Sequence, residues 1–251
     1  MKINILKTND LYLKAFKYIS INSKSNTLPY HNMEHIMLVF TNAYYASNYY
    51  KINETLRDSA EEELCVAALF HDVNHSGGEL TDSENISNSI LSFESFWIDY
   101  NNGEIGESES KFRRNVIDII EATEFPYKDM DLNIQQKIIR DCDMMSFNDD
   151  NHIYHYLFGM KEEFGIEDFN DQLKNQTKFI LNMKLHTEWG RDKFDDKYGG
   201  LLGDLNFLSK VFKDSSFEKE NEGEEMQTMT INGKKMHPYK REYIQHDEYD
   251  E

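Results

Sequence analysis

The chain has 251 residues, 39% of them apolar, which suffices for one large domain with a sizeable core. Its 46 acidic and 27 basic residues give a net charge of −19, which argues against DNA or RNA as a partner, because phosphate backbones are bound by clustered Lys and Arg. No segment has the ~20 apolar residues of a membrane span or the apolar run of a signal peptide, and two cysteines predict no disulfide framework. We therefore expect a cytoplasmic protein without a membrane partner.

Helical periodicity dominates the chain as far as about residue 212. Apolar spacing predicts helices over residues 11–19, 32–50, 56–70, 84–100, 112–122, 133–147 and 154–164, and a further helix from 169 through 189. A loop rich in Ser, Gly and Asp covers residues 75–83, and a polar linker covers residues 101–110. Stretches with a period of two are rare, so the sequence predicts an all-α helical bundle over residues 1–212.

The composition changes at about residue 213. Residues 213–251 are mostly charged and poor in aliphatic side chains, which is typical of an acidic, partly mobile C-terminal tail. Within this tail, the segment "TINGKK" predicts a short hairpin around Asn232 and Gly233, because Asn-Gly is a favoured two-residue turn.

Three segments of the predicted bundle carry residues that could ligate a metal ion. In "YHNMEHIML", His31 and His35 are four apart and share one face of a helix. Taken alone, they are equally well explained as two hydrogen-bonded histidines on a partly exposed helix. In "AALFHDVNHSGG", His71 and Asp72 close an apolar run, where burial of an imidazole and a carboxylate is costly unless they bind a partner.

The third segment, "IIRDCDMMSF", places Asp141 and Asp143 in another apolar helix. Side chains two apart on a helix point to roughly opposite sides, so only one of these carboxylates should face the site. Imidazole nitrogens combined with carboxylate oxygens suit Zn, Mn, Fe or Mg. The three segments together therefore predict a site for a divalent metal ion.

This order of motifs resembles the HD superfamily of metal-dependent phosphohydrolases, and more closely its cyclic nucleotide phosphodiesterase branch. The two histidine motifs of that branch have counterparts in "YHNMEH", which begins at Tyr30, and in "HDVNHSG", which begins at His71. Cys142, Asp143 and Met144 fit the small–Asp–apolar pattern of the later ligand, which favours Asp143 over Asp141. The resemblance spans roughly residues 30–189, although the stretch between the two motifs and the later Asp is short for that branch.

The resemblance implies an HD-domain-like bundle and a role for each motif residue. Two divalent ions would be bound, the tighter one by His35, His71, Asp72 and Asp143. Asp72 would bridge to the second ion, which would be coordinated mostly by water. His31 would be catalytic, as the general acid that protonates the leaving alkoxide.

Four further residues follow from the same resemblance. His75 would also be catalytic, through hydrogen bonds to metal-bound water or to a ligand, unless it only packs the Gly77–Gly78 turn. Tyr30, Gln176 and Phe179 would bind substrate: the amide would pair with a base and the ring of Phe179 would stack on it. The alternative for Phe179 is a place in the core stripe of its own helix.

The expected activity is hydrolysis of a cyclic or linear nucleotide phosphodiester by a metal-activated water, with a small-molecule nucleotide as substrate. The alternatives are a nucleotide monophosphatase or triphosphohydrolase of the same superfamily, and an HD-type di-iron oxygenase. The oxygenase class requires additional histidines for its second iron, and between Asp72 and Asp143 the chain offers only His75. A nucleotide-binding sensor without turnover would have lost a ligand, and none is missing.

Overall fold

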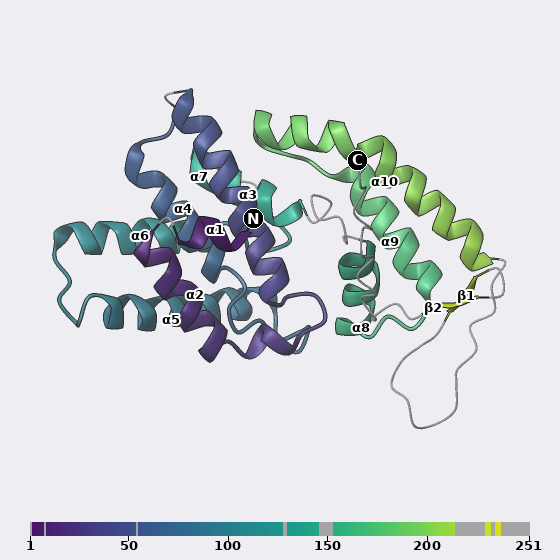
Figure 1. The fold of residues 1–251 in the computed structure, drawn as a ribbon, viewed down its shortest axis with the longest axis horizontal. Helices are drawn as coiled ribbons and strands as arrows, with labels where there is room; N and C mark the ends of the chain where they lie inside the picture. The colour runs from purple at the N-terminus through teal and green to yellow at the C-terminus, as the bar shows by residue number, and fades with distance from the viewer. Residues whose placement is uncertain are drawn as a thin grey trace, which may run out of the picture.

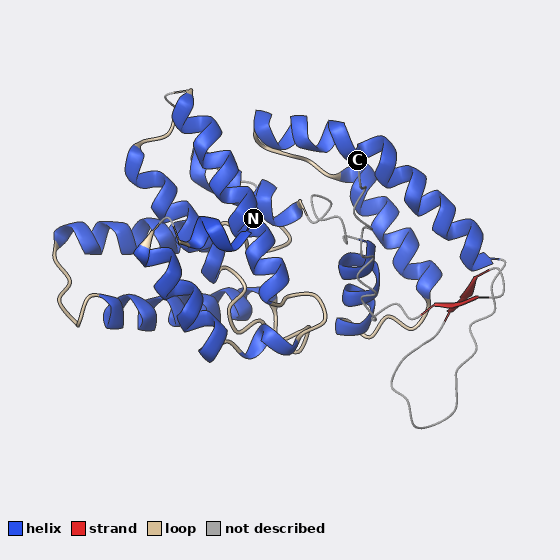
Figure 2. Cartoon of the chain, viewed as in Figure 1, coloured by secondary structure: helices blue, strands red, loops and turns tan. Residues whose placement is uncertain are grey.

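The structure is a computed structural model that describes residues 2–7, 9–53, 55–127, 130–145, 153–213, 229–231 and 234–236. The expected all-α class is confirmed: within these residues the helices are joined by loops, and the strands are limited to one pair of three residues each (Figures 1 and 2). The first group of helices comprises α1 (Lys2–Leu6), α2 (Asp10–Asn22), the 3-10 helix η1 (Lys24–Thr27), α3 (Met33–Ile52), α4 (Asp58–Phe70), α5 (Asp82–Tyr100), α6 (Glu107–Glu121) and α7 (Ile134–Met144).

Helix α4 occupies the centre of this group and packs against α2, α3, α5, α6 and α7. Every residue from Leu64 to Phe70 is fully buried, so the end of this helix is apolar on all sides. A helix that is apolar all round belongs in the interior of a protein. Helix α4 therefore ends inside the core at its C-cap His71, and the residues that follow start from a rigid, buried support.

The second group comprises the π-helical segment η3 (Ile153–Gly159), α8 (Met160–Glu163), α9 (Phe169–Asn182) and α10 (Glu188–Lys213), and lies to one side of the first (Figure 1). The helix predicted over residues 154–164 is confirmed, although its first half is π-helical and only its second half is α-helical. Gly159 packs against the segment that precedes α3 in the first group. A Cβ atom at Gly159 would lie 2.8 Å from the carbonyl oxygen of Pro29.

The prediction of one continuous helix from residue 169 through 189 was wrong. Helix α9 ends at Asn182, and α10 begins at Glu188. The hydroxyl of Thr187 accepts a hydrogen bond from the backbone N–H of Gly190 at 3.0 Å, as an N-cap residue does. This cap starts a new helix, so the intervening residues 183–187 run as a connection between the two.

Helix α5 begins slightly earlier than the periodicity predicts. Its N-cap is Thr81, whose side chain accepts a hydrogen bond from the backbone N–H of Glu84. The carboxylate of Glu84 accepts in return from the backbone N–H of Thr81 at 2.8 Å, which completes a capping box. The loop of residues 75–80 is thus fixed at its far end by the start of a helix.

The strands β1 (Met229–Ile231) and β2 (Lys234–Met236) pair antiparallel where the sequence predicts a hairpin. The turn residues of this hairpin, Asn232 and Gly233, and the expected mobile segments 214–228 and 237–251 lie outside the described residues. Among the helices that are described, none is both long and apolar enough to cross a membrane.

Candidate metal centre

Four of the residues that the sequence nominates as metal ligands converge at the end of the central helix. His35 comes from the first turn of α3, His71 and Asp72 follow α4, and Asp143 lies in the last turn of α7. The Nε2 atom of His35 lies 3.1 Å from Asp72 Oδ2 and 3.2 Å from Asp143 Oδ1. The Nε2 atom of His71 lies 3.1 Å and 3.5 Å from the same two oxygens.

The local backbone determines where the two histidines point. Asn32 is the N-cap of α3 and accepts hydrogen bonds from the backbone N–H of Glu34 at 2.8 Å and of His35 at 3.4 Å. The Nδ1 atom of His71 lies 2.9 Å from the carbonyl oxygen of Ala68, so Nδ1–H donates to this carbonyl and Nε2 faces the cluster. A histidine that ligates a metal typically holds its other ring nitrogen in this way.

The four groups perturb each other's protonation. Burial alone lowers the pKa values of His35 and His71, but the carboxylates of Asp72 and Asp143 outweigh it and raise both. Burial alone raises the pKa of Asp143, but hydrogen bonds from the two imidazoles outweigh it and lower this pKa to about 2. For Asp72 the charge of His71 is the largest opposing cause, and its pKa falls well below the usual range. The two carboxylates therefore favour positive charge beside them, either a proton on an imidazole or a metal ion.

The donor set fits a single divalent ion. The two Nε2 atoms face one another at 3.3 Å, and the carboxylate oxygens lie 3.1–3.5 Å from them. Ligand atoms about 2.1 Å from one ion in tetrahedral or octahedral geometry lie about 3.0–3.4 Å apart. With Nδ1–H of His71 committed to Ala68, its Nε2 is directed at Asp72, and a metal ion between them would take the place of the proton that the raised pKa favours on Nε2.

Of the two aspartates on α7, the structure places Asp143 among the possible metal ligands, as the sequence predicts. Asp143 belongs to the cluster, whereas Asp141 is fully buried and points to the start of α10. Asp141 accepts hydrogen bonds from the backbone N–H groups of His186 and Thr187, both at 2.8 Å, and from the hydroxyl of Thr187 at 2.6 Å. The two carboxylates thus face opposite sides of α7, as the spacing predicts.

A second group that could hold a metal ion lies beside the first and consists of His31, His75 and Glu163. Glu163, the last residue of α8, accepts hydrogen bonds from the backbone N–H groups of Tyr30 at 2.8 Å and of His31 at 3.0 Å. Its carboxylate also contacts Nδ1 of His31, and its side chain is 1% exposed. The ring of His75 stacks on that of His31, with centroids 3.8 Å apart.

His75 is held as a neutral imidazole. Burial, with the charge of His31 as the second cause, lowers its pKa to about 4. Its Nδ1 atom accepts a hydrogen bond from the backbone N–H of Gly77 at 3.1 Å, so the ring proton sits on Nε2. Gly77 has a positive φ of 69°, which lets the loop turn back toward the ring.

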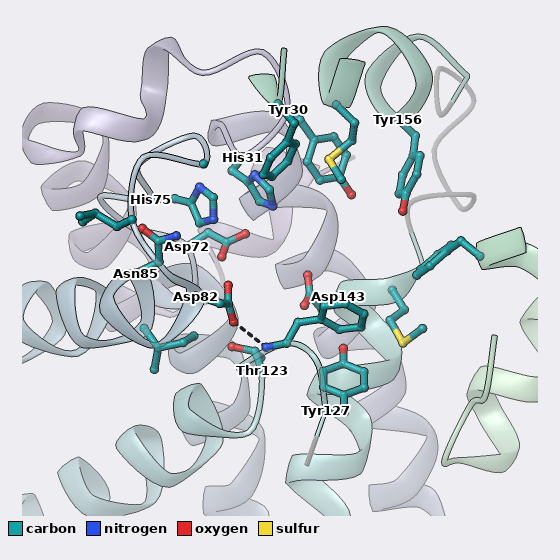
Figure 3. A pocket seen from close by; sticks show the side chains of 18 residues that line it. Tyr30, His31, Asp72, His75, Asp82, Asn85, Thr123, Tyr127, Asp143 and Tyr156 are labelled. Carbon is teal, nitrogen blue, oxygen red and sulfur yellow. Dashed lines mark hydrogen bonds between the residues drawn. The ribbon is translucent and has the colours of Figure 1, made fainter. Parts of the chain in front are cut away.

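Both groups border a cavity of about 360 Å³, shown in Figure 3. Its walls include Tyr30, His31, Asp72, His75 and Asp143. Among the described residues that line it, none is Lys or Arg. The cavity is therefore a pocket in which positive charge would come mainly from bound metal.

The three residues predicted to bind substrate, Tyr30, Gln176 and Phe179, differ in their position relative to the pocket. Tyr30 lines the pocket and packs edge-on against His31, with ring centroids 4.7 Å apart. Phe179 also lines it, and its ring stacks on that of Tyr156. Gln176 is buried, 5% exposed, and does not belong to the wall of this pocket. The structure thus places Tyr30 and Phe179 on the pocket wall, whereas Gln176 is buried on α9 away from that wall.

Three residues of the pocket wall and one residue behind it escaped the sequence-based reasoning. Glu163 stands in "KEEFG", a segment whose charges are typical of a solvated helix, and nothing in that pattern reveals a buried carboxylate. Tyr127 and Tyr156 lie on separate sides of the cavity, and Asp82 accepts a hydrogen bond from the backbone N–H of Phe125 at 2.5 Å (Figure 3). Burial raises the pKa of Asp82.

Comparison with protein-family models and with curated proteins finds no match to this chain. Any assignment of chemistry therefore depends on the motifs and on the geometry of the two residue groups.

Proposed function

We propose that this protein is an HD-type, metal-dependent phosphohydrolase, and that it cleaves a nucleotide phosphodiester. The observation that carries the proposal is the convergence of His35, His71, Asp72 and Asp143 on one point at the edge of a pocket. Their order along the chain is the order of ligands in the family that the sequence resembles. A divalent ion held by them would supply Lewis acidity toward a phosphoryl group and an activated water.

The residues around this centre have distinct roles in the proposed reaction. His31 lies on the pocket wall and is the general acid, donating from Nε2 to the leaving oxygen while Glu163 holds Nδ1. His75 is neutral and offers Nε2–H as a hydrogen-bond donor to a phosphate oxygen or a water. Glu163 acts through His31 and is a positioning residue.

The charge of the pocket favours a phosphodiester over a triphosphate as the group that lies at the metal centre. Asp72, Asp82 and Asp143 contribute carboxylates to the described wall, and no Lys or Arg balances them. A phosphodiester carries one negative charge, which a metal centre can neutralise. A triphosphate would bring further anionic groups to the metal centre itself, where none of the described wall residues is Lys or Arg.

Metal analysis combined with an ester screen tests the proposal. Purified protein freed of metal and then supplied with Mn²⁺, Mg²⁺, Zn²⁺ or Fe²⁺ should hydrolyse bis-p-nitrophenyl phosphate and a cyclic or linear nucleotide diester. It should release little inorganic phosphate from nucleoside monophosphates. Efficient dephosphorylation of monophosphates without cleavage of any diester would instead identify a phosphatase.

The second residue group favours one further candidate, an HD-type di-iron oxygenase. His31, His75 and Glu163 place nitrogen and oxygen donors within 4.8 Å of one another, beside the first group. Such a protein would bind two irons and consume O₂ with an organic substrate. Diester hydrolysis that proceeds equally well without O₂ and with Mn²⁺ alone would exclude this candidate.

A further inference from the structure

A second cavity adjoins the metal pocket and has the opposite electrostatic character. It measures about 600 Å³ and lies between α7, α9 and the connection that precedes α10. The two cavities share four wall residues, all aromatic or apolar except for one hydroxyl: Phe125, Tyr127, Met144 and Phe179. A ligand that reaches from one cavity into the other therefore crosses a wall suited to a flat ring.

Cationic side chains gather in this second cavity, although the chain as a whole has a net charge of −19. Its wall contains Lys137 and Arg140 of α7 and Lys184 of the connection, against a single described carboxylate, that of Asp131. The metal pocket shows the reverse, with carboxylates and no described Lys or Arg. We call these three side chains the cationic wall.

The cationic wall is built partly from fixed groups. The guanidinium carbon of Arg140 lies 4.4 Å from the ring centroid of Tyr127, and its Nε donates to the carbonyl oxygen of Ala122 at 2.6 Å. Lys137 is three positions earlier on α7 and so shares the face of Arg140. Burial is the largest cause that lowers the pKa of His186 on the same wall, and the charges of Arg140 and Lys137 lower it further.

The two lysines are available to a ligand. Lys137 is half-buried and Lys184 is exposed. Within the described part of the chain, neither ammonium group has a hydrogen-bond or ion-pair partner. An anion that enters this cavity would meet the ammonium groups of Lys137 and Lys184 without displacing an ion pair of either lysine.

From this arrangement we propose that the cationic wall binds a second phosphate of the substrate, so that the substrate class is a nucleotide phosphodiester with a further phosphate on the other side of the nucleoside. The inference rests on the proposed function. The scissile diester lies at the metal centre, the sugar and base lie against Tyr127 and Phe179, and the second phosphate reaches Lys137 and Lys184. Dinucleotides, whether linear with a terminal phosphate or cyclic, have this arrangement of groups.

A matched pair of chromogenic esters tests the proposal. Thymidine 5′-(p-nitrophenyl phosphate) carries one phosphodiester, and its 3′-phosphorylated form carries the same diester with one additional phosphate. In both, water attacks phosphorus, the bond to p-nitrophenolate breaks, and thymidine 5′-phosphate or its 3′-phosphate derivative remains. We expect the added phosphate to lower KM at least about tenfold in the wild type, the scale of charge-assisted hydrogen bonds.

Charge removal then identifies where the added phosphate binds. In the double variant Lys137→Gln/Lys184→Gln, the ratio of the two KM values should fall to within about twofold of one. The matched control is Lys178→Gln/Lys193→Gln, which removes two exposed lysines that line neither cavity, and in this control the ratio should persist. Arg140 is kept, because its guanidinium also supports Tyr127. Equal KM values in the wild type, or a ratio that survives in the double variant, would overturn the inference.

Binding without turnover separates this inference from the proposed function. Titration calorimetry compares thymidine 3′,5′-bisphosphate with thymidine 5′-monophosphate, on the Mn²⁺-loaded wild type and on both double variants. A preference for the bisphosphate that depends on Lys137 and Lys184 supports the second-phosphate site even if neither ester is hydrolysed, in which case only the proposed function fails. Equal affinities rule the site out whatever the turnover. A lower KM for cyclic than for 5′-phosphorylated linear dinucleotides would then distinguish the two sources of the second phosphate.

Discussion

Glu163 and His31 are 132 positions apart in the sequence, and the carboxylate of Glu163 accepts hydrogen bonds from both Nδ1 and the backbone N–H of His31. These bonds hold the backbone of His31 and one nitrogen of its imidazole, and leave the Nε2 atom for the pocket. The same carboxylate lies 3.6 Å from Nδ1 of His75. A single residue of α8 thus organises the side of the pocket that faces the metal ligands.

His31 should contribute to rate and not to metal content. We expect His31→Asn to lower turnover of an ester with an alkoxide leaving group by ~10²–10⁴-fold, because the leaving oxygen is no longer protonated. An ester that releases p-nitrophenolate needs little protonation and should lose much less. Turnover of both esters and bound metal by elemental analysis are the measurements. Equal losses on the two esters would indicate that His31 is structural.

Glu163 should act through His31. In Glu163→Gln, the neutral amide keeps a similar shape but no longer accepts the imidazole proton as a carboxylate does, so we expect turnover of the alkoxide ester to fall ~10–100-fold. The loss should again be smaller for the p-nitrophenyl ester, and it should not add to that of His31→Asn in the double variant. The control is Glu162→Gln, one position away on the exposed side of α8. A loss of equal size on both esters would contradict a role through His31.

The ion pair of Glu163 also predicts a pH dependence of stability. Burial alone raises the pKa of Glu163, but the hydrogen bond to His31 and its charge outweigh it and lower this pKa below the usual 4.5. A carboxylate with a depressed folded-state pKa stabilises the fold above its unfolded pKa, and this stabilisation is lost as the pH falls through the folded value. In metal-free protein, wild type should therefore exceed Glu163→Gln by ~1–3 kcal/mol near pH 6, with the difference shrinking below about pH 4.5. Denaturant melts from pH 3 to 6 measure it, and a constant difference would argue against the ion pair.

Much of the site could be predicted because its parts are local in sequence. The spacing of His31 and His35 and the apolar run before His71 are properties of single helices, and each was readable from residue order alone. Residues 183–187 show the limit of that approach. Their aliphatic spacing continues that of α9, and the break arises because Asp141, more than 40 positions earlier, binds the backbone of His186 and Thr187. Glu163 escaped for the same reason, since its burial depends on a segment 132 positions away.

Asp141 and Asp143 offer a matched pair of substitutions. Asp143→Asn should lose bound metal while helicity by circular dichroism is retained, because this side chain contributes to the centre and not to a helix cap. Asp141→Asn should retain metal but lose ~1–3 kcal/mol of unfolding free energy, since the carboxylate accepts three hydrogen bonds at the start of α10. Mn²⁺ at 100 times its Kd should stabilise wild type and Asp141→Asn by ~2.7 kcal/mol, and Asp143→Asn far less. The reverse pattern would assign the ligand to Asp141.

Gln176 and Phe179 are three apart on α9, and the structure separates their expected effects. Phe179 lies on the wall shared by the two cavities, so we expect Phe179→Ala to raise KM for a nucleotide diester by about 5- to 150-fold, the scale of ~1–3 kcal/mol for a base stacked on an aromatic ring. Cleavage of bis-p-nitrophenyl phosphate, which has no base, should change less. Gln176 is buried away from both walls, so Gln176→Ala should lower the melting temperature and leave KM nearly unchanged. If Gln176→Ala instead raises KM as much as Phe179→Ala does, the amide reaches the nucleotide when substrate is bound, and the recognition expected from the sequence holds for both residues.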